Sequence, residues 1–340
     1  MQLDKIYFEV KTYIGKLNFS KLWKGFKPLK FALYTDSECF FDGKFIPKTG
    51  EFLANTCIVY NGERIAIWYL QEEIDAIVLA SKIVHEMFHG FQSMHAKFDS
   101  EYEIDALYNY KYSDKNLNLK LKENNLLCSL SEQFEENVFS ELLKIRKYRC
   151  DNFPYEYNYE ARVEQIEGSA EYVELMCLEQ LSKPLFEKRL LSIRQRIVSA
   201  NNLLPVRICC YDIGALLLFI LIQNNIEFDT SFASHSFFEN LLQDVCKTEC
   251  VSGFDTQNDI KEFFRKAELT IEGALLKNDV VCDVSCDILG VNVYNAVCVK
   301  NHIISQFFVM YGSLDNPKVE MGNFVIETNA YKKLTKIYRI

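Results

Sequence analysis

The chain is poor in the two residues that most often interrupt regular structure. Among its 340 residues are only 6 prolines and 13 glycines. Long flexible linkers and turn-dense all-β proteins both depend on these residues, so their scarcity argues against either class. Large rings are abundant instead, with 26 phenylalanines and 19 tyrosines. We therefore expect a globular protein whose cores are rich in aromatic side chains.

A long apolar run is also missing. The strongest one, IGALLLFILI at residues 213–222, is about half the length that spans a bilayer, which predicts a buried helix. The first residues, MQLDKIYFEV, contain acids and lack the apolar region of a signal peptide. Without an export signal, the 12 cysteines are expected to be reduced thiols. The sequence thus predicts a cytoplasmic protein with no membrane partner.

Positive charge is in the minority. Lysine and arginine total 38 against 47 aspartates and glutamates, a formal net charge of −9. No basic stripe follows any expected helix, so nucleic acid is not an expected partner. The glycine-rich loop of phosphate sites and the G-x-S-x-G turn of serine hydrolases are absent as well.

Strand-like and helix-like segments occupy different parts of the chain. Residues 29–70 are rich in aromatic and β-branched residues divided by Asp42-Gly43 and Asn61-Gly62, which predicts a small, mostly antiparallel sheet. A helical period follows, and strand-like text returns near the C-terminus. We therefore expect an α+β fold with a mostly helical catalytic domain over residues 1–270 and a β-rich segment over residues 271–340.

The most informative motif is HEMFH, which starts at His85 in an expected helix over about 73–95. Residues four apart lie on one face of a helix, so His85 and His89 can direct nitrogens at one metal ion. Glu86 lies beside that face, within reach of a water on the metal. The motif predicts a zinc site with Glu86 as the general base. The alternative is a structural helix with two partly buried histidines and no metal.

A catalytic zinc ion usually has a third protein ligand. The expected helix over about 159–181 contains E-G-x-A-x-Y, which starts at Glu167. Its small residues allow two helices to approach closely around an ion. Glu164 and Glu171 share roughly the same helical face and are competing candidates for the third ligand. A solvated acidic face is the alternative without a metal.

HEMFH followed by E-G-x-A-x-Y resembles the gluzincin zinc metallopeptidases, the clan of thermolysin and aminopeptidase N. The resemblance implies a zincin-type domain in which the glutamate before the glycine, Glu167, is the third ligand. It also implies that the acid four residues later, Glu171, orients a zinc-bound histidine, here His85. The later pattern Y-x-x-G-A resembles the aminopeptidase N segment that carries the transition-state tyrosine, here Tyr211. The alternative for Tyr211 is a side chain that packs on the core.

The sequence departs from this family in two respects. The segment between His89 and Glu167 is much longer than in aminopeptidase N-like enzymes, and we expect a helical pair near 117–148 beside the cleft. The G-x-M-E-N motif, which anchors the free amine of a substrate in aminopeptidases, does not precede HEMFH. This absence argues against exopeptidase action on free N-termini. The strand ERIAIWYL, residues 63–70, is expected to be the edge strand that pairs with an extended peptide.

The sequence thus predicts a Zn²⁺ metallopeptidase that acts on a peptide or protein substrate. Zinc on His85, His89 and Glu167 activates water, Glu86 transfers the proton, and Tyr211 stabilises the oxyanion. The competing class is a catalytically silent protein of the same fold that serves as a scaffold or binds a partner. An intact Glu86 counts against that class, because a silent site is free to lose its base. The sequence predicts no oligomeric state.

Overall fold

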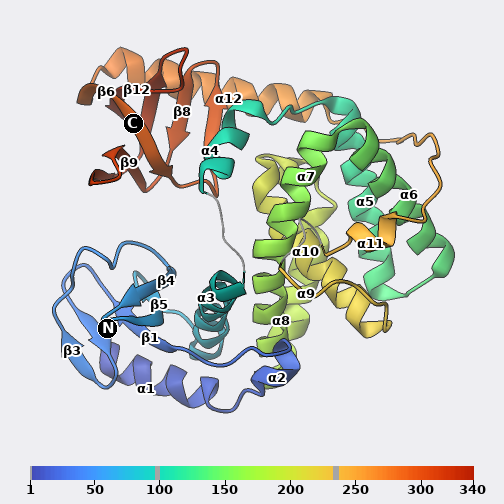
Figure 1. Cartoon of the computed structure of the whole chain (residues 1–340), viewed down its shortest axis with the longest axis horizontal. Helices are drawn as coiled ribbons and strands as arrows, with labels where there is room; N and C mark the ends of the chain where they lie inside the picture. Colours follow the sequence, from blue (N-terminus) through green and yellow to red (C-terminus); the bar gives the residue numbers. More distant parts are fainter. Residues whose placement is uncertain (1, 96–99, 233–236) are drawn as a thin grey trace.

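The computed structural model describes residues 2–95, 100–232 and 237–340, which form an α+β fold (Figure 1). In this view the N-terminal sheet lies at the lower left, the C-terminal sheet at the upper left, and the helices of the middle of the chain on the right. Helix α3 (Ala76–His95) lies between the N-terminal sheet and that helical layer. The predicted fold class is confirmed.

Five strands form the N-terminal sheet, in the order β3-β2-β1-β5-β4. Their bounds are Lys30–Tyr34 for β1, Cys39–Phe41 for β2, Lys44–Ile46 for β3, Thr56–Tyr60 for β4 and Glu63–Tyr69 for β5. Strands β1 and β5 are parallel, and the other neighbours are antiparallel. The turns predicted at Asp42-Gly43 and Asn61-Gly62 are both present, with positive φ at both residues as two-residue hairpins require.

The terminal strand beside α3 is β4, not β5. Ile65 of β5 has partners on both sides, Lys30 of β1 and Ile58 of β4. The expectation that residues 63–70 form the edge is therefore wrong. The hairpin at Asn61-Gly62 turns β5 inward, where it pairs in parallel with β1 and leaves β4 outermost in the described sheet.

Helices α1 (Leu3–Ile14) and α3 cover one face of this sheet. Successive residues of a strand point to opposite faces, so Phe31 packs against the helices while Ala32 belongs to the core on the other face. Gly90 lets α3 come close to β4, because a Cβ at this position would lie 2.6 Å from Sγ of Cys57. The motif helix is therefore held directly beside the edge strand.

One short helix, α2, precedes the N-terminal sheet, and further helices make up the middle of the chain. Their bounds are Phe19–Leu22 for α2, Ser100–Asn109 for α4, Asp114–Glu132 for α5, Glu136–Asn152 for α6, Pro154–Val163 for α7, Ser169–Leu181 for α8, Lys183–Ile197 for α9, Ala200–Leu203 for the 3₁₀ turn η2, Val206–Gln223 for α10 and Glu239–Leu242 for α11. The pair expected near 117–148 corresponds to α5 and α6. The helix expected over 159–181 corresponds to α7 and α8, which a π-helical turn, η1 (Glu164–Gly168), joins without a break.

Helix α10 contains the apolar run of the sequence. Among the described residues it is the one helix with the length and composition of a bilayer-crossing segment, but 72% of it is buried inside the protein. It packs against α8 and η1, so the run serves as a core helix here.

The C-terminal part has a long helix followed by an antiparallel sheet. Helix α12 spans Gln257–Lys277, so the boundary expected between residues 270 and 271 falls inside it. The sheet has the order β10-β9-β6-β12-β11-β8-β7. The bounds are Val280–Val291 for β6, Val297–Val299 for β7, His302–Ser305 for β8, Phe308–Ser313 for β9, Asn316–Met321 for β10, Phe324–Thr328 for β11 and Leu334–Arg339 for β12. Helix α12 packs on one face, and Leu107 and Tyr108 of α4 pack on the other.

Candidate metal centre

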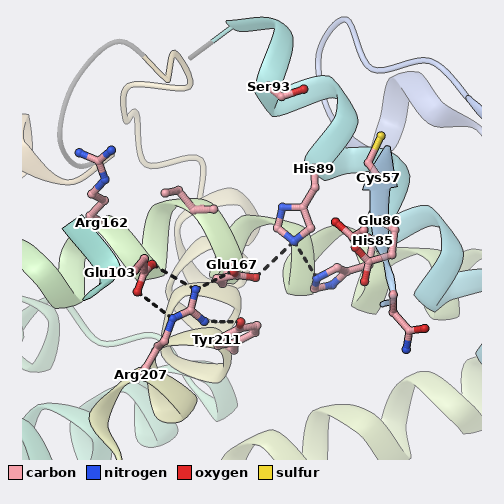
Figure 2. Close-up of a pocket in the computed structure, with 13 residues that line it drawn as sticks. Cys57, His85, Glu86, His89, Ser93, Glu103, Arg162, Glu167, Arg207 and Tyr211 are labelled. Carbon is pink, nitrogen blue, oxygen red and sulfur yellow. Dashed lines mark hydrogen bonds and ion pairs between the residues drawn. The ribbon is translucent and has the colours of Figure 1, made fainter. Parts of the chain in front are cut away.

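The two histidines of HEMFH meet on one face of α3. Nε2 of His85 lies 3.1 Å from Nε2 of His89 (Figure 2). His85 is buried, and the side chain of His89 is 21% exposed to the pocket. Two nitrogen lone pairs at this distance repel each other unless a proton or a cation lies between them. The arrangement fits a shared proton or a bound cation.

Glu167 completes the group from the π-helical turn. Its Oε2 lies 3.2 Å from Nε2 of His89, and the ligand atoms of His85, His89 and Glu167 all lie within 4.8 Å of one another. The competing glutamates have other partners. Glu164 is buried against Arg146. Of the three carboxylates considered from the sequence, Glu167 is thus the one that the structure brings to both histidines.

His89 is fixed by a side chain on its own helix. Gln92 donates from Nε2 to the carbonyl of Ile166 and to Oγ of Ser169, at 2.7 and 2.9 Å. Its amide oxygen therefore faces His89 and accepts from Nδ1 at 2.7 Å. This bond places the imidazole proton on Nδ1 and leaves Nε2 as a lone-pair donor for a metal. Gln92 is fully buried. It therefore orients the His89 imidazole through Nδ1 and does not line the cleft.

The acid that faces the far side of His85 is Glu174, not Glu171. Oε2 of Glu174 lies 3.4 Å from Nδ1 of His85. Glu171, which was predicted to pair with His85, lies in the same group, with ligand atoms within 4.8 Å of one another, and it bonds Arg189 of α9. Arg189 holds the Glu171 carboxylate toward α9. Glu174 lies one turn further along α8, next to Nδ1 of His85.

These acids set the ionisation of the site. Burial alone disfavours a charged imidazole, but Glu174 and Glu86 outweigh it and raise the pKa of His85 to about 9. Burial likewise opposes a charged Glu174, but His85 and Lys82 lower its pKa to about 2. In the metal-free protein, His85 therefore carries a second proton at neutral pH and is positively charged. A bound cation would replace that second proton.

Glu86 lines the pocket and is largely buried. Burial raises its pKa, although His85 and His89 act in the opposite direction. A carboxylate whose pKa is raised toward neutrality is suited to accept and return a proton. The opposite holds for Glu167. There, His89 and Arg207 overcome the effect of burial and hold the pKa of the carboxyl well below its usual range, so it stays ionised.

Arg207 connects the metal group to the rest of the pocket. From α10 it donates to Oε1 of Glu167 at 3.0 Å, to both oxygens of Glu103 at 3.1 Å, and to the hydroxyl of Tyr211. Because that hydroxyl accepts from Arg207, its own proton is available to another acceptor in the pocket. Burial raises the pKa of Tyr211 well above its usual value, against the effect of Arg207, so the phenol is neutral.

Sequence reasoning did not identify Arg207, Glu103 or Glu174. Arg207 precedes Tyr211 by one helical turn, and this spacing was a usable indication that the two side chains share a face. Glu103 lies on α4, in the segment between the two motifs, and nothing local marks it. Arg207, Glu103 and the metal group line a pocket of about 490 Å³, together with Asn55 and with Thr56 and Cys57 at the start of β4.

Gly168 is needed for a different contact from the one expected. A Cβ there would lie 2.5 Å from Cα of Gly214, so the glycine lets η1 touch α10. The close approach is thus to the helix of Arg207 and Tyr211, and not to α3. It brings Tyr211 and Glu167 to the same pocket.

The donor set fits zinc. Two imidazole nitrogens and one carboxylate oxygen form a known ligand set of catalytic zinc sites, which keep a fourth position for water or substrate. Tetrahedral ligands about 2 Å from an ion are roughly 3.3 Å apart. The two closest ligand–ligand distances here, 3.1 and 3.2 Å, agree with this spacing.

Comparison with known proteins gives no relative for this chain: no family model, no curated protein and no solved structure matches it.

Proposed function

We propose that this protein is a zinc-dependent hydrolase that cleaves peptide bonds in a peptide or protein substrate. The observation that carries the proposal is the convergence of Nε2 of His85, Nε2 of His89 and Oε2 of Glu167, with Glu86 in the same pocket. The hydrogen bond at Nδ1 of His89 supports it, because this imidazole then presents its Nε2 lone pair to the site, and Glu174 lies 3.4 Å from Nδ1 of His85. The proposal includes a cytoplasmic location, in line with reduced thiols.

When bound at these residues, zinc supplies Lewis-acid chemistry, which makes water more acidic and polarises a carbonyl. Glu86 then accepts the proton of the attacking water on its carboxylate and returns it to the leaving amine. The raised pKa of Glu86 makes its carboxylate a stronger base for the first of these transfers. The donor for the developing oxyanion is Tyr211, whose hydroxyl proton is left available by Arg207.

Strand β4 is the proposed docking edge for the substrate. Asn55, Thr56 and Cys57 line the pocket at the outer side of the sheet. An extended peptide laid along this edge gains main-chain hydrogen bonds without a particular sequence. Such binding suits a segment whose carbonyl must reach the metal group, and it favours a peptide over a small amide as the substrate.

Two measurements test the proposal. Purified wild type is expected to bind one zinc ion per chain, and Glu167→Ala is expected to lose most of it. A peptide library incubated with wild type, with and without chelator, is expected to show cleavage that the chelator abolishes. A wild type without zinc would rule out the metal site. Zinc without cleavage would favour the competing class, a silent scaffold or partner-binding protein.

A further inference from the structure

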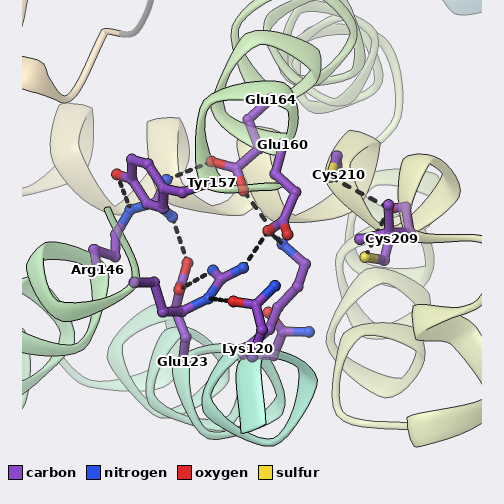
Figure 3. Close-up of polar contacts among 12 residues, drawn as sticks. Lys120, Glu123, Arg146, Tyr157, Glu160, Glu164, Cys209 and Cys210 are labelled. Atoms are coloured by element: carbon purple, nitrogen blue, oxygen red, sulfur yellow. Dashed lines mark hydrogen bonds and ion pairs between the residues drawn. The ribbon is translucent and has the colours of Figure 1, made fainter. Parts of the chain in front are cut away.

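A cluster of ionised side chains is buried among the helices of the middle of the chain (Figure 3). Three cations and three carboxylates take part, so the cluster is electrically balanced. Each is at most 1% exposed: Lys120, Glu123, Arg146, Arg149, Glu160 and Glu164. We call this group the buried charge cluster.

Arg146 bridges two glutamates of the cluster. Its two Nη atoms donate to Glu123 and to Glu164, each at 2.5 Å. Arg149 repeats the pattern between Glu123 and Glu160, at 2.7 and 2.5 Å. Lys120 adds a bond to Glu160 at 2.6 Å. The cluster is therefore one connected network of charge-assisted hydrogen bonds.

The network joins the helical pair to the segment that carries the third ligand. Lys120 and Glu123 lie on α5, and Arg146 and Arg149 lie on α6. Their partners are Glu160 on α7 and Glu164, the first residue of the π-helical turn. Glu167 lies three residues further along the same turn. The inserted pair thus binds the start of the turn that presents Glu167 to the histidines.

Stability alone gives no reason for such a cluster. Burying charges costs desolvation energy, and well-packed apolar residues of similar volume often stabilise a fold as well or better. What a charged network adds is a defined geometry, because each head group has a fixed set of partners. We therefore expect the cluster to act by fixing the position of the segment that it binds.

That segment is a π-helical turn, a rare form that appears mostly as single turns inside α-helices and often at functional sites. Contacts fix both of its ends. At its start, Glu164 is bonded to Arg146. At its end, Gly168 lies against Gly214, and the following Ser169 bonds Gln92. A regular α-helix over these residues has a different rotation between the two ends, so the contacts at both ends favour the π-helical turn.

We propose that Arg146 and Glu164 are positioning residues for the metal ligand Glu167. Their ion pair holds the start of the π-helical turn, so that the turn does not relax to α-helix and rotate Glu167 away from His85 and His89. The inserted helical pair α5–α6 is thereby part of the metal site although it supplies no ligand. This inference rests on the metal site of the proposed function.

The test compares two charge-balanced double variants. Arg146→Met with Glu164→Gln removes the pair that holds the turn. Arg149→Met with Glu123→Gln removes the same two kinds of group and keeps Arg146 on Glu164. Zinc affinity is measured by competition with a chelator, after thermal unfolding of the metal-free proteins has identified a temperature at which all are folded. The first variant is expected to bind zinc roughly 10- to 100-fold more weakly than wild type, and the control close to wild type.

Visible absorption of the Co²⁺-loaded proteins reports the ligand geometry directly. The expected result is a changed spectrum for the first double variant and a wild-type spectrum for the control. Should a double variant not fold, the single variants Glu164→Gln and Glu123→Gln, which remove either partner of Arg146, repeat the comparison. Equal zinc affinities and spectra in the two arms overturn this inference but leave the proposed function intact. A wild type that binds no metal defeats the proposed function itself.

Discussion

Oε2 of Glu174 lies 3.4 Å from Nδ1 of His85, on the opposite side of the ring from the nitrogen that faces His89. Partners of this kind orient a metal-bound histidine, and their loss typically weakens metal binding 10- to 100-fold. We expect roughly that loss of zinc affinity in Glu174→Gln, measured by chelator competition.

Glu171→Gln is the matched control for this variant. Its carboxylate is equally buried and only one helical turn away, but it bonds Arg189. The control should therefore bind zinc more tightly than Glu174→Gln. Equal losses in the two variants would show that total negative charge near His85, and not the position of Glu174, governs affinity.

Glu86→Gln separates catalysis from metal binding. The substitution keeps the size of the side chain and removes its ability to accept a proton. Peptide cleavage is expected to fall by at least about 100-fold, while zinc content stays at the wild-type value. Turnover rate and bound zinc are measured on the same preparation. Appreciable cleavage by a zinc-loaded variant would exclude Glu86 as the base.

Tyr211→Phe removes one hydroxyl and keeps the ring, which lies 5.6 Å from that of Tyr294. If the hydroxyl stabilises the oxyanion, kcat falls roughly 10²- to 10³-fold with little change in KM. Steady-state kinetics on one cleaved peptide distinguishes the two parameters. A higher KM at unchanged kcat would instead assign the hydroxyl to substrate binding.

Gly168→Ala is expected to loosen the contact between η1 and α10. The new methyl group meets backbone atoms of Gly214, which cannot move independently, so we expect a loss of roughly 1–3 kcal/mol in the free energy of unfolding. Zinc affinity should fall as well, since Glu167 is the preceding residue. Gly273→Ala in α12 meets nothing within 4 Å and should instead stabilise by about 0.5–1 kcal/mol. Denaturant titrations measure both changes.

The buried charge cluster also predicts acid sensitivity. Burial opposes a charged Glu160, but Arg149 and Lys120 lower its pKa to about 2 from its ordinary 4.5. A lowered pKa in the folded state means that the stabilisation is complete above about pH 4.5 and is lost as the pH falls toward 2. Urea titrations between pH 5 and 3 should show a steep loss for wild type. Glu160→Gln should show a flatter profile, and the exposed-site control Glu272→Gln a wild-type one.

Local sequence patterns predicted the structure correctly where it depends on residues that are close in sequence. Asn61-Gly62 predicted a hairpin because few residue pairs adopt positive φ twice in succession. The same hairpin placed β5 beside β4 but did not determine which strand is outermost. That depends on β1, which is more than twenty residues earlier and pairs with β5 in parallel. The edge strand was therefore misassigned from the sequence.

The sequence by itself determined the spacing of His85 and His89, because a residue four positions on returns to the same helical face whatever surrounds the helix. Only the tertiary structure decided which groups meet this pair. Arg189 bonds Glu171, and Glu174 is the acid that lies 3.4 Å from Nδ1 of His85. Arg207 bonds Glu103 across more than a hundred residues. Such contacts depend on how separate helices pack and rotate against one another, and no local period in the chain encodes that.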